Sequence, residues 1–237
     1  MRGELSSAKF AKRHPLDWYV DPVWCAEQLV KHLVNFRLEK IGGRAIWDPA
    51  AGLGNTIDSF MARGFETYLS DVVENVDWAS RDPAQWNTPL TDYELAFYRR
   101  PQFFSADFLE LEKAPAKCSI VCNPPYSYRK GILEAFVRHA LKLVLECGGD
   151  RVCMLVPNKW LASQSRYQLF SVDHPPAEVL HLCQRPSMPP GDRIALMGNR
   201  AFRGGMIDYC WLVWNVKFPT PAGQTRTVWL PPLGGQS

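Results

Sequence analysis

The sequence predicts an α/β fold in which helices cover both faces of a mostly parallel sheet. Short apolar runs of strand length alternate with stretches of helical periodicity along the 237 residues, and most turns between them are short. A turn with two glycines joins the first apolar run to a helix, which is typical of proteins that bind ligands at the carboxyl ends of parallel strands. With 46% hydrophobic and 22% charged residues, the chain can bury the core of one sizeable domain without disulfides.

The first half of the chain begins with a helix and continues with strands. Asp21 and Pro22 are a good N-cap and first helical residue, and apolar residues at helical spacing follow as far as Val34. The predicted strands cover residues 44–47, 65–70 and 103–108. The glycine turn opens a second helix, which ends at Gly64. Residues 72–102 are too long for a plain connection, so we expect a partly helical insertion.

The second half continues the alternation and ends in a tail. The predicted strands cover residues 118–122, 152–156, 179–182 and 207–216, and a helix covers residues 132–145. Residues 184–206 form a loop rich in Arg, Gly and Pro, which is a candidate substrate loop. We therefore expect a single domain over residues 1–218 and a loose, Pro/Gly-rich tail over residues 219–237.

The composition indicates the cellular compartment and limits the kinds of binding partner. Seven cysteines, without a Cys-x-x-Cys pair, indicate reduced core residues in a cytoplasmic protein. Residues 1–15 lack the apolar core of a signal peptide and no run reaches the length of a membrane span, so we expect no export and no membrane partner. Five dispersed histidines predict no metal site. A net charge of +3 permits a nucleic-acid partner but falls short of a dedicated binder.

The most informative motif is Asn123-Pro124-Pro125-Tyr126, directly after the strand predicted over residues 118–122. Proline fixes its own φ and biases the preceding residue towards extended geometry, so these four residues form a rigid elbow. The elbow places hydrogen-bond acceptors beside a flat aromatic ring. This arrangement predicts a pocket for a planar molecule that carries an NH₂ group, whereas the plain alternative is a turn that ends a strand.

The second motif is the turn over residues 48–55, Asp-Pro-Ala-Ala-Gly-Leu-Gly-Asn. Its two glycines, Gly52 and Gly54, let backbone approach a ligand closely. The turn lacks the third glycine of the dinucleotide fingerprint and the Gly-Lys-Ser/Thr of a phosphate loop, which disfavours NAD and ATP. Asp71, at the end of the next strand, could accept hydrogen bonds from ribose hydroxyls. Without the elbow, the favoured explanation of these residues is a plain turn and a solvated strand end.

In this order, the two motifs resemble the motif pair of S-adenosylmethionine-dependent amino methyltransferases, most closely the small bacterial and phage DNA adenine methyltransferases. The resemblance covers residues 18–216 and matches the subgroup in which cofactor motifs precede the catalytic one. It implies a Rossmann-like class I methyltransferase fold, with a seven-stranded, mostly parallel sheet whose last strand, residues 207–216, is antiparallel. The chain departs from the family in having no segment long enough for a conventional sequence-recognition domain, so strong sequence specificity is not expected.

The resemblance also implies roles for individual residues. It assigns the binding of S-adenosylmethionine to Trp18, Tyr19, Asp21, Asp48, Pro49, Ala50, Gly52, Gly54, Asn55, Asp71, Asp107, Phe108 and Asn123. Within this set, Asp71 would hold the ribose, and Asp107 with Phe108 would bind and cover the adenine. The elbow, Asn123 to Tyr126, would carry the catalytic residues.

The elbow suits transfer of a methyl group to an aromatic amine. Such an amine is a poor nucleophile because its lone pair is conjugated into the ring. Hydrogen bonds to the Asn123 side-chain oxygen and the Pro124 carbonyl would draw the nitrogen towards tetrahedral geometry and aim its lone pair at the methyl sulfonium, so no strongly perturbed base is required. Tyr126 would stack on the ring, and the proton could leave after transfer.

Substrate contacts are predicted at Tyr126, Lys159, Arg185, Arg193, Arg200 and Arg203. Flipping a base out of duplex DNA costs a few kcal/mol, whereas one aromatic stack returns about 1–3 kcal/mol, so Tyr126 needs further contacts unless the substrate is single-stranded. DNA is the favoured partner. RNA and protein glutamine also present a planar NH₂ and stay open as acceptors, and a non-catalytic binding module with the same fold is the remaining alternative.

Overall fold

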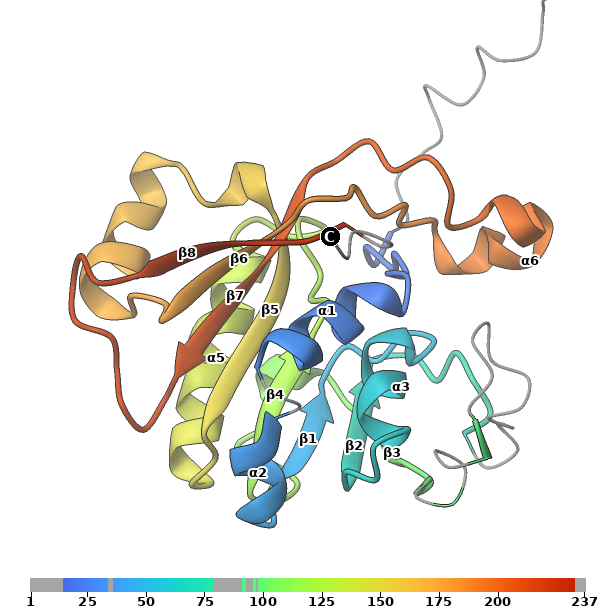
Figure 1. Ribbon diagram of the computed structural model, residues 1–237, viewed down its shortest axis with the longest axis horizontal. Coiled ribbons are helices and arrows are strands. Elements are labelled where there is room, and N and C mark those ends of the chain that lie inside the picture. Colours follow the sequence, from blue (N-terminus) through green and yellow to red (C-terminus); the bar gives the residue numbers. More distant parts are fainter. Residues whose placement is uncertain (1–14, 34–35, 79–90, 93–95, 97, 233–237) are drawn as a thin grey trace, which may run out of the picture.

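The computed structural model describes residues 15–33, 36–78, 91, 92, 96 and 98–232 of the chain. Within these residues, an eight-stranded sheet runs in the order β3-β2-β1-β4-β5-β7-β6-β8 (Figure 1). The strands are β1 (Ala45–Asp48), β2 (Thr67–Asp71), β3 (Gln102–Ser105), β4 (Cys118–Cys122), β5 (Arg151–Pro157), β6 (Glu178–Leu182), β7 (Tyr209–Asn215) and β8 (Arg226–Leu230). The α-helices are α1 (Trp24–His32), α2 (Arg37–Ile41), α3 (Asn55–Met61), α5 (Ile132–Glu146) and α6 (Ile194–Met197).

The strand directions agree with the predicted fold class. The strands β3, β2, β1, β4 and β5 pair with one another in parallel. In contrast, β7 is antiparallel to both of its neighbours, β5 and β6. The antiparallel strand is therefore the one predicted over residues 207–216. It is not the last strand, however, because β8 follows it and pairs with β6 in parallel. The sheet has eight strands instead of the seven expected.

The additional strand corrects the expectation of a loose tail over residues 219–237. β8 carries Thr227, Val228 and Trp229, which are residue types that favour strands, and Leu230 at its end is buried. Without β8, the outer edge of β6 would present unpaired backbone groups. A Pro/Gly-rich composition therefore hid a strand that pairs with a distant part of the chain.

Helices cover both faces of the sheet because successive strand residues point to opposite sides. Trp47, Ile120 and Met154 pack in one apolar cluster with the buried face of α5. Their neighbours along the strands, among them Ile46 and Val121, pack in a second cluster with α1 and α3. Figure 1 shows α1 and α3 on the viewer's side of the sheet and α5 beyond it. Each fully buried side chain of this size contributes about 1.5–3 kcal/mol to folding.

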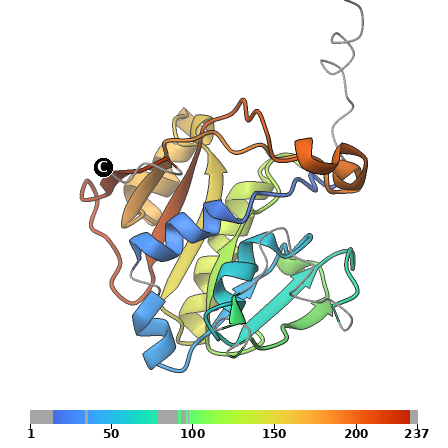
Figure 2. The same cartoon turned by 45° about the vertical axis from the view of Figure 1, so that its right-hand side comes forward.

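Three local predictions need correction. Asp21 is not an N-cap, because Val23 occupies that position and the Asp21 carboxylate accepts hydrogen bonds from other elements. The strand predicted over residues 103–108 ends at Ser105, and Asp107 instead accepts a hydrogen bond from the Leu109 N–H at the start of a helical turn. The loop over residues 184–206 contains α6, which Figures 1 and 2 show projecting beyond the sheet.

Other predictions concern single residue types and the insertion. All seven cysteines are free, but Cys183 is exposed and so is not a core residue. Residues 79–90, 93–95 and 97 lie outside the described part of the chain, so the partly helical insertion stays a prediction. None of the described helices is long and apolar enough to cross a membrane. The described residues also contain no group of three or more His, Cys, Asp or Glu side chains that could hold a metal ion.

Candidate functional site

Two cavities lie next to each other at the carboxyl ends of the parallel strands: the first follows β1, β2 and β4, and the second follows β4 and β5. The first pocket has a volume of about 510 Å³ and the second of about 570 Å³. Asn123 and Pro125 line the first pocket, whereas Tyr126 lines the second. Tyr19 lines both. The elbow predicted from the sequence therefore lies between the two cavities.

The glycine turn forms one wall of the first pocket. Gly52 and Gly54 have φ values of 52° and 84°, which only glycine adopts without strain. The Gly52 N–H donates a hydrogen bond of 2.9 Å to Asp71 Oδ2, which ties the turn to the end of β2. A Cβ at Gly52 would lie 3.1 Å from the Trp18 indole nitrogen, so the glycine also leaves room for that ring.

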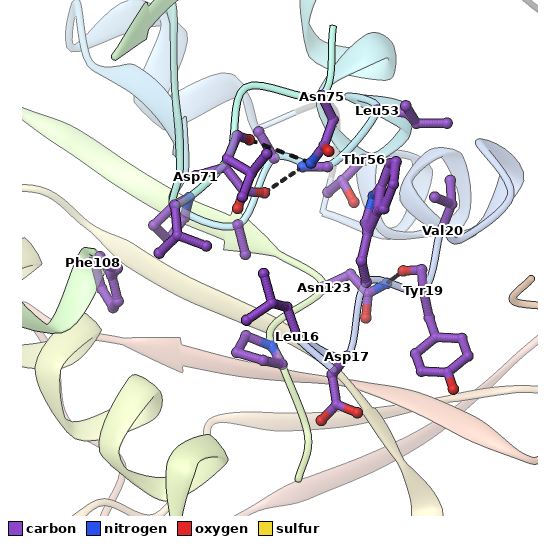
Figure 3. Close-up of a pocket in the computed structure, with 18 of the residues that line it drawn as sticks. Leu16, Asp17, Tyr19, Val20, Leu53, Thr56, Asp71, Asn75, Phe108 and Asn123 are labelled. Atoms are coloured by element: carbon purple, nitrogen blue, oxygen red, sulfur yellow. Dashed lines mark hydrogen bonds between the residues drawn. The ribbon is translucent and has the colours of Figure 1, made fainter. Parts of the chain in front are cut away.

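Two carboxylates support this wall in different ways. Asp48 is 1% exposed and accepts a hydrogen bond of 3.1 Å from the Ala50 N–H, so it shapes the turn from beneath. Burial raises the pKa of Asp48 well above its usual value. Asp71 lines the pocket, and burial raises its pKa as well, against hydrogen bonds from backbone N–H groups that lower it. Figure 3 shows Asp71 on one side of the pocket and Asn123 on the other.

The structure brings most of the predicted cofactor residues to this one cavity. Its lining includes Trp18, Tyr19, Asp21, Pro49, Ala50, Gly52, Asn55, Asp71, Asp107, Phe108 and Asn123. The exceptions are Asp48, which lies beneath the turn, and Gly54, which directly precedes α3. Sequence reasoning missed other lining residues, including Leu16, Asp17, Leu53, Thr56, Val72, Val73, Asn75 and Phe136. For part of this set the sequence did offer a signal, since the apolar pair Val72 and Val73 directly follows Asp71 at a predicted strand end.

The Asn123 side chain lies at the centre of a polar network. Its Nδ2 donates to the Tyr19 carbonyl at 3.0 Å and to Asp21 Oδ1 at 3.2 Å. Because a carbonyl and a carboxylate only accept hydrogen bonds, the amide nitrogen must face them and Oδ1 must face the other way. On that side, Oδ1 accepts a hydrogen bond from the Tyr126 hydroxyl, which also lies 3.2 Å from the Leu155 carbonyl.

The rest of the elbow supplies a second acceptor and a ring. Pro124 is buried, and among the described residues no N–H or O–H donates to its carbonyl. The ring of Tyr126 lies 6.0 Å from that of Tyr209, at an interplanar angle of 45°. Burial raises the pKa of Tyr126 well above its usual value, so it stays a neutral hydrogen-bond donor.

The second pocket is lined by rings from distant segments of the chain. Tyr19, Tyr126, Trp160 and Tyr209 contribute the rings, and Lys159 and Arg166 contribute positive charge, at the wall of a single cavity. The Arg166 guanidinium lies over the Trp160 ring, 5.1 Å from its centroid. Sequence analysis predicted Lys159 here but missed Arg166 and Tyr209, because nothing local links them to the elbow.

The four predicted arginines of the 184–206 loop do not line either pocket. Arg185 forms an ion pair with Asp208, with Nε and Oδ1 2.7 Å apart. Arg193, Arg200 and Arg203 are exposed on the segment around α6. Their contact with a substrate stays a prediction, and it requires a substrate that extends beyond the cavities.

The start of this loop is nevertheless attached to the first pocket. The Val20 N–H donates to the Pro189 carbonyl at 3.0 Å, and the Gly191 N–H donates to the Trp18 carbonyl at 3.1 Å. A Cβ at Gly191 would overlap the Trp18 indole, so glycine is required for this packing. The Trp18 side chain is therefore held between the glycine turn and the loop.

Comparison with known proteins identifies the fold. No protein-family model and no curated protein sequence matches this chain. The structure resembles that of a provisionally assigned RNA methyltransferase from Pyrococcus horikoshii, with a TM-score of 0.56 and 20% identity over 89% of this chain and 91% of that chain. A magnesium protoporphyrin IX methyltransferase from Synechocystis PCC 6803 is similar at a TM-score of 0.46 and 16% identity, over 79% of this chain and 78% of that chain. The fold is the Rossmann-like α/β methyltransferase fold.

Proposed function

We propose that the protein is an S-adenosylmethionine-dependent methyltransferase that methylates the exocyclic amino group of adenine in DNA. The observation that carries this proposal is the position of the elbow between two cavities. The cavity on one side is lined by the predicted cofactor residues. The other is lined by aromatic rings and cations, with the Asn123 oxygen on the side of Tyr126.

The residues of the first pocket fit S-adenosylmethionine. The turn at Gly52 lines the pocket and can present backbone to a ligand, and the Asp71 carboxylate offers acceptors for the two ribose hydroxyls. Phe108 supplies a flat apolar surface suited to an adenine ring. When bound, the cofactor supplies an electrophilic methyl group on a sulfonium sulfur.

The elbow would prepare the acceptor amine. Its two hydrogens would bind the Asn123 Oδ1 and the Pro124 carbonyl, which turns the nitrogen lone pair towards the first pocket. An amide oxygen has two lone pairs, so Oδ1 can accept from the substrate while the Tyr126 hydroxyl stays close or moves to the Leu155 carbonyl. In this position the amine nitrogen would face the methyl group that bound S-adenosylmethionine supplies, and Asn123 and Pro124 would hold the amine in that orientation.

The lining of the second pocket favours a nucleobase over a glutamine side chain. Glutamine presents a planar NH₂ but no ring, so it would gain nothing from stacking on Tyr126 or Trp160. A base stacked on an aromatic side chain gains about 1–3 kcal/mol. Lys159 and Arg166 are placed to attract the phosphates that accompany a base in a nucleic acid.

The proposal is tested by following label from methyl-labelled S-adenosylmethionine. Single-stranded DNA, duplex DNA, RNA and glutamine-containing peptides would be incubated with the protein, and nucleosides and peptides would be identified by mass spectrometry. We expect N6-methyladenine in DNA, lost in Asn123→Ala and Tyr126→Ala variants whose circular dichroism matches the wild type. Label transfer unaffected by both substitutions would remove the elbow from the mechanism. Absence of calorimetric heat with the cofactor would refute the methyltransferase itself.

A further inference from the structure

Residues 16–21 contact the elbow at Asn123, its first residue, and at Ser127, which directly follows its last residue. At the first position, the Tyr19 carbonyl and Asp21 Oδ1 accept the two hydrogen bonds of the Asn123 amide nitrogen. At the second position, Asp17 Oδ2 accepts a hydrogen bond from the Ser127 N–H. Asp17 has a φ of 54°, a conformation that non-glycine residues adopt at a cost and that concentrates at functional sites. Three hydrogen bonds therefore join a segment and an elbow that lie more than 100 residues apart.

Asp21 is held by hydrogen bonds from two other parts of the chain. Asp21 is 4% exposed, and the Thr56 hydroxyl, with its single proton, lies 3.2 Å from Oδ1 and 3.1 Å from Oδ2 of the carboxylate. The Asp21 carbonyl accepts a hydrogen bond of 2.8 Å from Asn55 Nδ2. A buried carboxylate is costly unless it is well hydrogen-bonded, and here its donors come from α3 and from Asn123. The family resemblance assigns Asp21 to cofactor binding, but in the structure Asn123 and Thr56 already donate to its carboxylate.

We infer that Asp21 is a positioning residue for Asn123: with Thr56 and the Tyr19 carbonyl, it holds the amide so that Oδ1 faces the acceptor. If the amide turned over, its NH₂ would meet the NH₂ of the substrate, and the hydrogen bond that prepares the amine would be lost. The catalytic consequence rests on the proposed function. The orientation of the amide does not, because it follows from the contacts of this chain alone.

The surroundings of Asp21 make this orientation sensitive to pH. Four titratable groups interact electrostatically with the Asp21 carboxylate: Cys25 on α1, Asp48 on β1, Cys122 on β4 and Tyr126 on the elbow. None of them is a cation, and burial raises the pKa of Asp21 to about 6. Below that pH the carboxylate gains a proton, and the Asn123 amide loses its charged acceptor. The hydrogen bond from the Asn123 amide nitrogen to Asp21 should therefore weaken as the pH falls through 6.

Kinetics of Asp21→Asn separate a positioning role from cofactor binding. We expect kcat at saturating cofactor to fall at least about tenfold and the dissociation constant of S-adenosylmethionine to change less than about twofold, since positioning acts on the reacting geometry. The acid limb of the kcat profile near pH 6 should disappear. The matched variant Asp107→Asn, which alters another acid of the same pocket, should weaken cofactor binding and keep the acid limb. Weaker cofactor binding in Asp21→Asn with an unchanged kcat would overturn the inference.

A second substitution tests the support for the carboxylate. Thr56→Val keeps the shape of the side chain and removes the hydroxyl that donates to the Asp21 carboxylate. We expect the same direction of change as in Asp21→Asn, with a smaller fall in kcat. An unchanged kcat in Thr56→Val together with a lowered kcat in Asp21→Asn would show that Asp21 positions the Asn123 amide without help from Thr56.

Nuclear magnetic resonance gives a readout that needs no activity. The side-chain amide of Asn123 is assigned by its loss in Asn123→Ala. In the wild type, we expect its two proton signals to titrate with a midpoint near pH 6, and in Asp21→Asn to be independent of pH. A titrating amide in a protein that transfers no methyl group would refute the proposed function and leave the positioning intact. An amide that does not titrate, in an active enzyme, would overturn the positioning alone.

Discussion

The two pockets differ in what builds them. Besides apolar and aromatic side chains, the first contains backbone turns and buried carboxylates that hydrogen bonds hold in place, such as the turn at Gly52 that is tied to Asp71. The second is formed by rings and long cations from four separate parts of the chain, such as Tyr209 and Arg166. A cavity made of backbone and held carboxylates is preorganised, because few of its groups can rotate. A cavity made of side chains can adapt, so under the proposed function the second pocket is the part of the site where substrate choice can change.

The largest expected effect falls on the residue at the boundary of the two pockets. Asn123→Ala should lower kcat by about 10²–10³-fold, because it removes a hydrogen-bond acceptor that acts on the reacting amine. Binding of S-adenosylmethionine, measured by calorimetry, should weaken much less. If cofactor affinity and kcat fall by the same factor, Asn123 acts by binding the cofactor, and the two pockets do not have the separate roles proposed here.

A substitution in the backbone-built pocket should weaken the cofactor without changing the acceptor. Gly52→Ala places a Cβ in a left-handed conformation and 3.1 Å from the Trp18 nitrogen, and we expect a rise in the cofactor dissociation constant of about 10–100-fold. Gly43→Ala is the matched control, since Gly43 has a φ of 61° and open space at its Cβ. Equal losses of cofactor affinity in both variants would mean that backbone strain acts globally instead of in the pocket.

The buried carboxylate behind the first pocket should affect stability in a pH-dependent way. The pKa of Asp21 is raised from 3.8 to about 6 in the folded protein, so the folded state binds its proton more tightly than the unfolded state. The contribution of this group to the free energy of unfolding is therefore fully present below about pH 4 and is lost as the pH rises through 6. Relative to Asp21→Asn, the wild type should lose about 1–2 kcal/mol between pH 5 and pH 8. Denaturant unfolding of both proteins at the two pH values measures this difference, and an equal pH dependence would contradict it.

The smallest effects are expected in the side-chain-built pocket. Lys159→Ala and Arg166→Ala should each weaken DNA binding by about 1 kcal/mol and reduce the slope of log affinity against log salt by about one, while cofactor affinity stays constant. The same measurement on Arg200→Ala tests whether the exposed loop also meets phosphate. A salt slope unchanged by Lys159→Ala and Arg166→Ala would show that this pocket does not meet a nucleic acid.

The same contrast explains how much could be predicted from the sequence. The strand over residues 118–122 was predicted with its exact bounds, because an apolar run meets two prolines there. The glycine turn was recognisable because its glycines and its helix are neighbours in the sequence. The parallel sheet followed from the alternation of strands and helices, and the structure confirms it. Contacts of local origin were therefore predictable.

Contacts between distant residues were not. The Asp21 carboxylate meets Thr56 and Asn123, which lie 35 and 102 positions away, and the local pattern instead suggested a helix cap. The rings of the second pocket meet only after the sheet has formed. β8 escaped prediction for the same reason, since a strand of five residues at a sheet edge depends on the partner that receives it.

β8 also has a consequence for any shortened form of this protein. Residue 218 looks like a natural end of the domain, yet a chain cut there would lose the strand that pairs with all five residues of β6. The ion pair of Arg226 with Glu178 would go with it. The uncovered edge of β6 could then pair with the same edge of another copy, and the shortened protein should self-associate. Trimming the tail to obtain a smaller protein would therefore yield a less soluble one.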